Sequence, residues 1–418
     1  PITPTNTPIT PTNTPITPTN TPITPTNTPI TPSPTPTFTM FGTGADGDLT
    51  VGPSQTLYTD DVRSGFSSSS SGNTLNVSSI TGFAAGQEVL VHQSRGSSAG
   101  QYEFAKIASV GIGQLILTSN LQNAYVQDST SRAQVVRVPN YNNVTVQNGG
   151  TLKAHDWDGS SGGILAFRSK GNLTIQSGGA ILTDGADGTS YTANAVTGGA
   201  VGGGYRGGNM NNQANVGNEA ERQAYTGEGY VGPSIQSGGN SGNGGGGGRN
   251  ANEESGAGGG HGAEGQRNDN GTGGHQGGSA VGDTALTSLY FGGGGGGGSN
   301  DSGPSGVTAG AGGSGGGIIF IVARTVNLSG SLTSNGGNGG SSNENSGGGG
   351  GAGGAIMVKG QNLSLGSSLI TALGGSGGST NTSARGGDGA IGRIRIEYCG
   401  SGTGTTNPAA SVAQITCQ

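Results

Sequence analysis

The sequence predicts an all-β protein whose main body is a β-solenoid resembling a parallel β-helix. Short apolar runs recur along the chain, Gly, Ser and Asn turns separate them, and helical periodicity is absent. Glycine supplies 93 of the 418 residues, roughly three times its average share of about 7%. A β-sandwich body is the alternative, because strand pairs alone do not fix how the chain winds.

The composition argues against several classes of partner. Only 29% of the residues are hydrophobic, but the 10% of charged residues is low for a disordered chain. The net charge of -6, without a basic stripe, argues against nucleic acid as a partner. No apolar run of about 18 residues occurs, so we expect no membrane-spanning helix. Because residue 1 is Pro, we expect a processed or partial chain whose signal segment is not included.

Residues 1–37 form a Thr/Pro tail with four copies of the heptad PITPTNT and a partial fifth. Proline fixes φ and pushes the preceding residue toward extended geometry, which excludes a helix or a central strand. We therefore expect a polyproline II rod. At about 3.1 Å per residue, 37 residues span about 115 Å, enough to reach a neighbouring subunit.

Two sets of tail residues are candidates for function. Segments rich in Thr and Pro are typical of O-glycosylated stalks. The candidate glycosylation sites are Thr3, Thr5, Thr7, Thr10, Thr12, Thr14, Thr17, Thr19, Thr21, Thr24, Thr26 and Thr28. One large apolar residue per heptad is more than a spacer needs, although an extended linker with incidental Ile is the alternative. The candidate subunit-docking residues are Ile2, Ile9, Ile16, Ile23 and Ile30.

Residues 38–138 are expected to form a small β domain, either a barrel or a sandwich. Alternating apolar runs separated by Gly, Ser and Asn turns predict its strands. These runs lie at 73–77, 87–93, 102–110, 114–119 and 133–138.

Residues 139–398 contain an internal repeat and are assigned to the solenoid. The tripeptides at 144–146 and 173–175 are followed by the related sequences QNGGTL and QSGGAI, 29 residues apart. Each copy has Gly-Gly, an apolar strand, a polar turn and further Gly turns, as expected when each repeat buries one small apolar face on its neighbours. Successive strands are expected to start at Ile164, Ile318, Ala355 and Ala390.

A Gly-rich insertion at 186–310 interrupts the repeat. It contains five consecutive Gly at 244–248 and seven at 292–298. Free polyglycine is costly to order. Two interpretations stay open: flexible surface loops, or stacked polyproline-II-like strands that pack closely because they lack side chains. Residues 286–291 end in LYF and are a plausible apolar plug beside the longest tract.

Cys399 and Cys417, the only cysteines, lie in the C-terminal tail 399–418. We expect a disulfide that fastens this tail and stabilises the protein by roughly 3 kcal/mol on loop-entropy grounds. Such a bond favours an extracellular or cell-surface location. Two free thiols are the alternative.

Sites for chemistry are few, and no zinc, P-loop or CxxC motif occurs. The motif AHDWDG places His155, Asp156 and Asp158 around the single Trp157, a combination seen in glycosidases and sugar sites. A solvated turn is the alternative. We expect no cofactor apart from covalent glycans, with Ca²⁺ as the one metal considered. Its candidate ligands, each also explained by an Asp-Gly turn, are Asp46, Asp48, Asp184 and Asp187.

Long stretches of the body are similar to known proteins. Residues 86–110, 133–152 and 316–340, with the Gly-rich insertion, resemble uncharacterised Gly-rich surface proteins of environmental bacteria. This resemblance covers 44–398 and implies no catalytic residues. The Thr/Pro repeat joined to such a body resembles subunits of glycan-coated extracellular fibrils. In composition, the glycine tracts also resemble the polyglycine sandwiches of phage tail-fibre adhesins.

The sequence therefore favours a structural protein rather than an enzyme: the subunit of an extracellular filament. Its partners would be further copies of itself, contacted through the tail, and the glycans on that tail. An adhesin with Gly-rich carbohydrate-binding loops is the first alternative. A carbohydrate-active β-helix enzyme using Asp156 or Asp158 is the second.

Overall fold

The structure, a computed structural model, divides the chain into two compact units, Pro1–Thr35 and Pro36–Gln418. The residues it describes are 40–191, 196–213, 223–248, 254–268, 275–300, 307–381 and 384–417. The heptad tail, with every candidate glycosylation and docking residue, lies outside the described residues.

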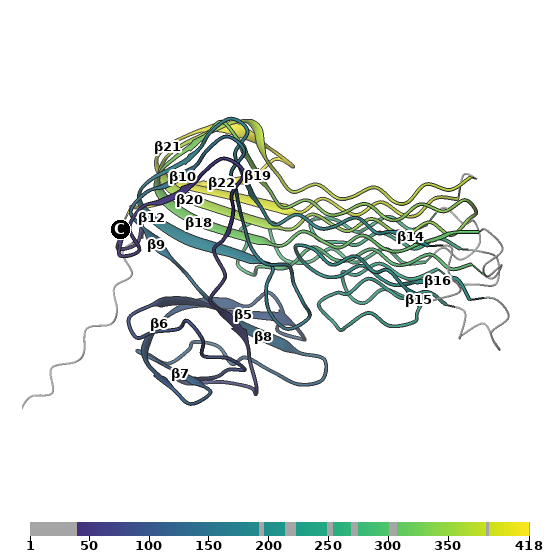
Figure 1. Ribbon diagram of the computed structural model, residues 1–418, viewed down its shortest axis with the longest axis horizontal. Coiled ribbons are helices and arrows are strands. Elements are labelled where there is room, and N and C mark those ends of the chain that lie inside the picture. Colours follow the sequence, from purple (N-terminus) through teal and green to yellow (C-terminus); the bar gives the residue numbers. More distant parts are fainter. Residues whose placement is uncertain are drawn as a thin grey trace, which may run out of the picture. The chain divides into compact units, whose positions relative to one another are not determined.

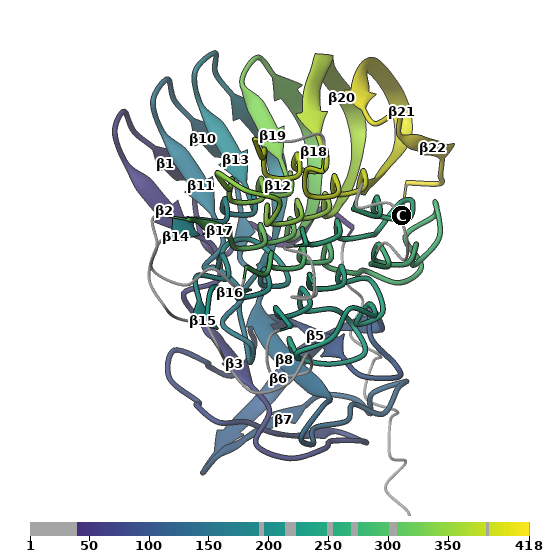
Figure 2. The ribbon, with the colours of Figure 1, turned by 90° about the vertical axis from the view of Figure 1, so that its right-hand side faces the viewer.

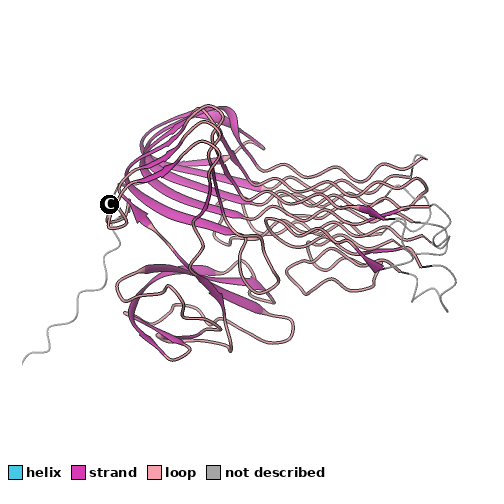
Figure 3. Ribbon diagram, in the orientation of Figure 1, coloured by secondary structure: helices cyan, strands magenta, loops and turns pink. Residues whose placement is uncertain are grey.

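All regular elements of the described residues are β-strands, which confirms the predicted all-β class (Figures 1 and 3). Two large sheets account for most of them: a nearly closed parallel sheet of the β-helix or barrel kind, and a curled antiparallel sheet. The part of the chain described here contains no helix that would be long and apolar enough to cross a membrane.

The parallel sheet is built from the predicted repeats and from two strands that precede them. Its strands are β1 (Leu49–Val51), β2 (Thr56–Tyr58), β9 (Asn140–Tyr141), β10 (Val144–Val146), β11 (Thr151–Lys153), β12 (Ile164–Ile175), β13 (Ala180–Leu182), β18 (Ile318–Leu328), β19 (Ser331–Thr333), β20 (Ala355–Thr371), β21 (Arg393–Asn407) and β22 (Ser411–Gln414). Because β1 and β2 pair with β10 and β11, the parallel sheet begins at Leu49, before the boundary of 139 drawn from the sequence.

Successive repeats stack residue on residue. The predicted tripeptides pair directly, with Val144 opposite Leu173, and the column continues through Val326 to Leu363. All four side chains are almost fully buried, and each contributes roughly 1.5–3 kcal/mol of hydrophobic stabilisation. The middle residue of each tripeptide, Thr145 in the first, points away from this core, which explains the apolar-polar-apolar pattern.

The antiparallel sheet has the strand order β3-β8-β5-β6-β7-β4. These strands are β3 (Arg63–Gly65), β4 (Thr74–Asn76), β5 (Glu88–Arg95), β6 (Tyr102–Gly111), β7 (Gln114–Leu117) and β8 (Arg132–Arg137). Five of them lie where the apolar runs predicted strands. The sheet curls around its own core and packs against the parallel sheet, with the rings of Phe104 and Phe320 4.9 Å apart.

The Gly-rich segments form a third part, named here the glycine array. It comprises the described residues of 183–317 together with 334–354 and 372–392, so it is larger than the predicted insertion. Its chains run side by side away from the parallel sheet (Figures 1 and 3). Most have no ladder pairing; the two short pairs are formed by β14 (Ser190–Tyr191) with β17 (Ala309–Gly310) and β15 (Val196–Thr197) with β16 (Met210–Asn211).

The central chain of the array, 292–298, is hydrogen-bonded to six neighbouring segments. Every third N–H reaches the same neighbour, and every third carbonyl accepts from the same neighbour. This three-residue period is that of a polyproline II helix. The six neighbours are 205–211, 225–228, 245–248, 257–260, 310–316 and 349–352. Of the two interpretations of the insertion, stacked strands describe this region.

The spacing of these chains explains why the tract is pure glycine. A Cβ placed on any residue of 292–298 would lie 1.6–2.2 Å from a backbone oxygen of a neighbouring chain. No other amino acid fits without moving the backbone. The entropic cost of ordering glycine is opposed here by backbone hydrogen bonds to six neighbouring segments.

Replacing Gly295 by Ala should destabilise the protein by about 3 kcal/mol or more, because its Cβ would lie 2.1 Å from the Gly349 carbonyl oxygen. Gly232→Ala is the matched control, since its Cβ would meet no atom within 4 Å. The control should change stability by less than about 0.5 kcal/mol. Denaturant unfolding measures both, and equal effects would contradict the close packing assigned to the array.

Candidate functional site

The AHDWDG motif lies where the two sheets and the glycine array meet. Trp157 is completely buried, and its ring packs 5.3 Å from that of Phe291 and 6.5 Å from that of Tyr205. The proposed apolar plug contributes to the same cluster through Leu286, Leu289 and Phe291, all almost fully buried. A sugar therefore has no access to the indole face, and the expectation of sugar stacking on Trp157 is wrong.

The indole N–H of Trp157 donates a 3.1 Å hydrogen bond to the Oε2 atom of buried Glu228. The same carboxylate accepts a 2.9 Å bond from Nε of Arg206 and forms an ion pair with Arg95. Arg95 belongs to β5, whereas Glu228 and Arg206 belong to the array. This carboxylate thus connects the antiparallel sheet, the glycine array and the loop between β11 and β12 that carries Trp157. The sequence did not indicate this role of Glu228, because a single Glu in a Gly-rich stretch belongs to no motif.

Asp156 and Asp158 have different surroundings. Oδ1 of Asp158 accepts hydrogen bonds of 2.7 and 2.8 Å from the N–H groups of Ser160 and Ser161, which is the Asp-led turn considered as the alternative. Oδ1 of Asp156 accepts a 3.2 Å bond from the N–H of Gly203 and lies 4.0 Å from Nζ of Lys153.

A group of titratable side chains surrounds His155 and is named here the His155 cluster: Tyr58, Asp60, Asp61, Lys153 and His155. The imidazole stacks on the Tyr58 ring at 4.0 Å, and its Nε2 lies 2.8 Å from Oδ1 of Asp61. Lys153 Nζ lies 5.8 Å from the centre of the Tyr58 ring. Strand β2 pairs with β11 and so brings residues 95 positions apart together, which the sequence motif alone did not indicate.

Asp60 is the buried carboxyl of this cluster. Its Oδ1 accepts a 2.8 Å hydrogen bond from the N–H of His155, and Oδ2 has no hydrogen-bond partner among the described residues. Burial raises the pKa of Asp60 to about 6, although the His155 bond and the positive charge of Arg63 act in the opposite direction. The cluster therefore combines a buried carboxyl of raised pKa with a solvent-accessible His–Asp pair.

The first pair of Ca²⁺ candidates is held by protein donors. Asp46 forms an ion pair with Arg137 and accepts a 2.6 Å hydrogen bond from the N–H of Asn140. Asp48 accepts three bonds of 3.0 Å from Asn142 and Asn143. These bonds, the side-chain amide of Asn143 first, lower the pKa of Asp48.

The second pair, Asp184 and Asp187, accepts hydrogen bonds from the neighbouring segment 333–338. Asp184 accepts bonds from the N–H of Asn335 at 2.6 Å and the hydroxyl of Thr333 at 2.8 Å, and Asp187 accepts one from the N–H of Asn338 at 2.7 Å. Burial raises the pKa of Asp184. Within the described ranges, no group of three or more His, Cys, Asp or Glu side chains is arranged to hold a metal ion.

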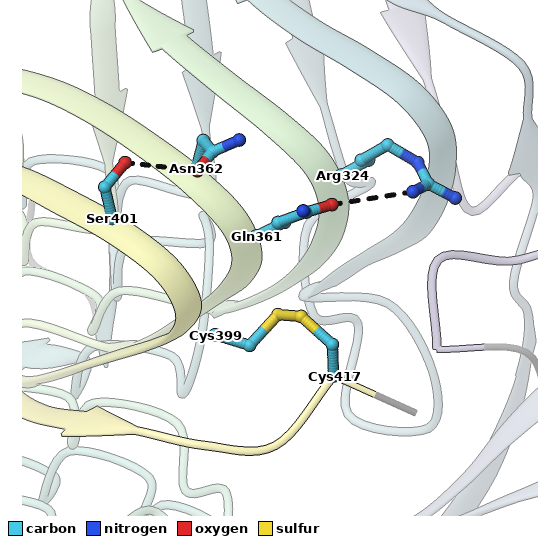
Figure 4. Close-up of a disulfide and its surroundings, with 6 residues drawn as sticks. All are labelled: Arg324, Gln361, Asn362, Cys399, Ser401 and Cys417. Atoms are coloured by element: carbon cyan, nitrogen blue, oxygen red, sulfur yellow. Dashed lines mark hydrogen bonds between the residues drawn. A yellow bond between two sulfur atoms is a disulfide. The ribbon is translucent and has the colours of Figure 1, made fainter.

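Cys399 and Cys417 form a disulfide with their Cα atoms 5.3 Å apart. The bond fastens the end of the described chain to β21 beside Arg324 and Gln361 (Figure 4). The same segment is held by a 2.8 Å hydrogen bond from the N–H of Ile415 to the carbonyl of Tyr398.

A groove of about 390 Å³ lies at the end of the parallel sheet formed by β21 and β22. It is lined by apolar and small uncharged side chains, without a single Asp, Glu, Lys or Arg. The lining residues are Leu365, Ile396, Tyr398, Gly402, Thr403, Gly404, Thr405, Thr406, Ala409, Ala410 and Val412.

Comparison with known proteins does not assign the chain to a family. No protein-family model matches it, and no curated protein matches its sequence. Among solved structures, it is similar to the Gp54 tailspike of Acinetobacter baumannii bacteriophage AP22, solved in complex with A. baumannii capsular saccharide. The identity is 7% and the TM-score 0.19, over 89% of this chain and 59% of the tailspike chain. A likeness at this level carries no functional argument.

Replacing Glu228 by Ala should destabilise the protein by about 3–5 kcal/mol, because Arg95 would be left buried without its counter-charge. Exposed Glu264 is the control, and Glu264→Ala should change stability by less than about 0.5 kcal/mol. Denaturant unfolding tests both. A small effect of Glu228→Ala would show that the three parts are held together without this carboxylate.

Asp60 should make the protein less stable as the pH rises from about 4 to about 6. In this window the folded state keeps the proton on Asp60 and the unfolded state loses it, so unfolding releases a proton and is favoured by higher pH. The expected change is on the order of 2–3 kcal/mol. Asp60→Asn, which cannot ionise, should remove this contribution. The measurement is the difference between the two proteins' stability–pH curves, and parallel curves would refute the assignment.

Proposed function

We propose that the protein is the structural subunit of an extracellular filament in which the heptad tail of each copy contacts neighbouring copies. The observation that carries the proposal is the tail itself. It consists of four uncharged Thr/Pro heptads and a partial fifth, each with one Ile, joined to a body made of stacked extended chains. At about 3.1 Å per residue it spans about 115 Å. Its hydroxyls would carry O-linked glycans and its Ile side chains would dock on the neighbouring copy.

In this proposal the parallel sheet is a β-solenoid in which each sequence repeat supplies one coil. The constant register between copies supports this winding, because Val144, Leu173, Val326 and Leu363 occupy one column. Solenoids are stabilised by contacts between neighbouring coils, and an open stack of this kind suits a repeating assembly.

The remaining parts of the body support a mechanical role at an extracellular location. The glycine array binds its chains through backbone hydrogen bonds in several directions. The Glu228 carboxylate connects it to the antiparallel sheet through Arg95 and, through Trp157, to the loop between β11 and β12 of the parallel sheet. The Cys399–Cys417 disulfide is typical of oxidising compartments.

An adhesin is the second candidate, and one observation favours it. Hydrogen bonds from the N–H of Asn300 to the Asn211 carbonyl and from the N–H of Ser299 to the Glu254 carbonyl place the ends of several array chains together, far from the parallel sheet. Glycan-array binding by discrete, unassembled particles would support it. The enzyme alternative has no such support, because Trp157 is buried and Asp158 holds a turn.

Deleting residues 1–37 should abolish filaments while leaving the body folded, because all but the last two deleted residues belong to a compact unit separate from the one that begins at Pro36. Electron microscopy of the natively isolated protein and of the deletion variant measures assembly, and the thermal midpoint controls for folding. A second variant with Thr at all five tail Ile positions separates docking from mere length. Filaments formed by the deletion variant would refute the role of the tail.

A further inference from the structure

Among the residues that the structure describes, both ends of the parallel sheet leave a strand edge unpaired over corresponding strands. At one end, β1 pairs only with β10, and β2 pairs only with β11, within this described part of the chain. At the other end, residues 401–407 of β21 pair only with β20, because β22 covers β21 at 395–398 alone. Figure 2 shows β1 and β2 at one edge of the stack and β21 and β22 at the opposite edge.

Two columns of large apolar side chains in the core end in a small residue at the last strand. The first passes through Val326 and Leu363 and ends at Gly402. The second passes through Leu152, Ile181, Leu332 and Ile370 and ends at Thr406. In both columns a small residue stands where each preceding coil has Val, Leu or Ile. The large apolar side chains of a next coil are therefore missing at this end.

The uncharged groove described above opens at this end of the stack. Leu365 and Ile396 on its wall are almost fully buried, whereas Val412 at its margin is 58% exposed. An apolar groove beside an unpaired strand edge is suited to take up a further strand, which would add main-chain hydrogen bonds and fill the groove with alternate side chains.

The opposite end of the stack supplies side chains of the missing kind. Leu49 of β1 begins the column that ends at Gly402, and Leu57 of β2 begins the column that ends at Thr406. Both leucines are only half-buried, whereas the equivalent Val144 and Leu152 on the next coil are almost fully buried. Leu49 and Leu57 thus gain burial if another coil covers them.

We propose that β1 and β2 of one copy stack on residues 401–407 of a second copy, so that Leu49 follows Gly402 and Leu57 follows Thr406. The parallel sheet then continues from copy to copy. The two surfaces are different, so the contact is head-to-tail and generates an open fibre instead of a closed dimer. This inference rests on the proposed filament for its partner, a second copy of the chain, but it uses the body and not the tail.

The test joins the two ends covalently. Leu57→Cys and Thr406→Cys variants are purified separately, mixed in equal amounts and oxidised mildly. Neighbouring strands lie about 4.7–4.9 Å apart, within the Cα separation of about 4.4–6.8 Å that a disulfide spans. We expect a dimer cross-linked between positions 57 and 406, identified by peptide mass mapping, in the mixture only. Mixing Thr406→Cys with Ile112→Cys is the control, because Ile112 is fully exposed on the antiparallel sheet.

A charge variant gives a second readout that does not depend on thiol chemistry. Thr406→Lys places a charge in the groove and should reduce assembly, measured by light scattering, at least tenfold. Ile112→Lys adds the same charge elsewhere and should leave assembly unchanged. Both variants should keep the thermal midpoint of the parent, which shows that the body remains folded. Normal assembly of Thr406→Lys would overturn the end-to-end contact.

The outcomes separate this inference from the filament proposal. Filaments of the natural chain without the 57–406 cross-link overturn the end-to-end contact and leave the filament proposal intact. A cross-link in a protein that never forms filaments supports the contact and overturns the filament. A cross-link from Thr406→Cys to Ile16→Cys in place of Leu57→Cys overturns the inference, because the groove then receives the heptad tail.

Discussion

The structure depends on the backbone hydrogen bonding of extended chains lying side by side. In the parallel sheet each inner strand bonds to neighbours on two sides, and apolar side chains fill the enclosed core. In the glycine array the same chains continue without side chains and bond to neighbours in several directions. The transition occurs at the Gly-Gly pairs before β18 and β20, so one residue type decides whether a chain belongs to the sheet or to the array.

Two buried ion pairs connect these parts. Arg168 of β12 pairs with Glu88 of β5 at 2.8 Å, and Glu228 connects Arg95 with the array. Buried ion pairs add little net stability because desolvation opposes the Coulombic gain, but removing one partner is costly. They are therefore suited to fixing the relative position of the antiparallel sheet, the parallel sheet and the array, which backbone hydrogen bonds within each part do not determine.

The sequence predicted the features that arise from local periodicity. The tripeptides at 144–146 and 173–175 indicated stacked strands, and their register is as their alignment implies. Composition did not decide the structure of the insertion. Flexible loops and stacked strands are both rich in glycine, and only the spacing of the chains distinguishes them. The His155 cluster and Glu228 were missed for a different reason. Asp60, Trp157 and Arg95 reach His155 or Glu228 from segments 71–133 residues away, and a single Asp or Glu carries no periodic signal.

At the two ends of the parallel sheet, strand edges and apolar side chains are left without the neighbouring coil that the inner strands have. Proteins usually blunt exposed strand edges with charges, prolines or bulges, because an open edge pairs with other chains. Here the last coil carries Gly402 and Thr406 in place of large apolar side chains, and the first coil carries half-buried Leu49 and Leu57. The strand segments proposed to meet, 49–51, 56–58 and 401–407, contain no Asp, Glu, Lys or Arg, and the two deviations compensate each other across copies. An explanation of either end by itself leaves the other without a physical reason, whereas a continuous stack accounts for both.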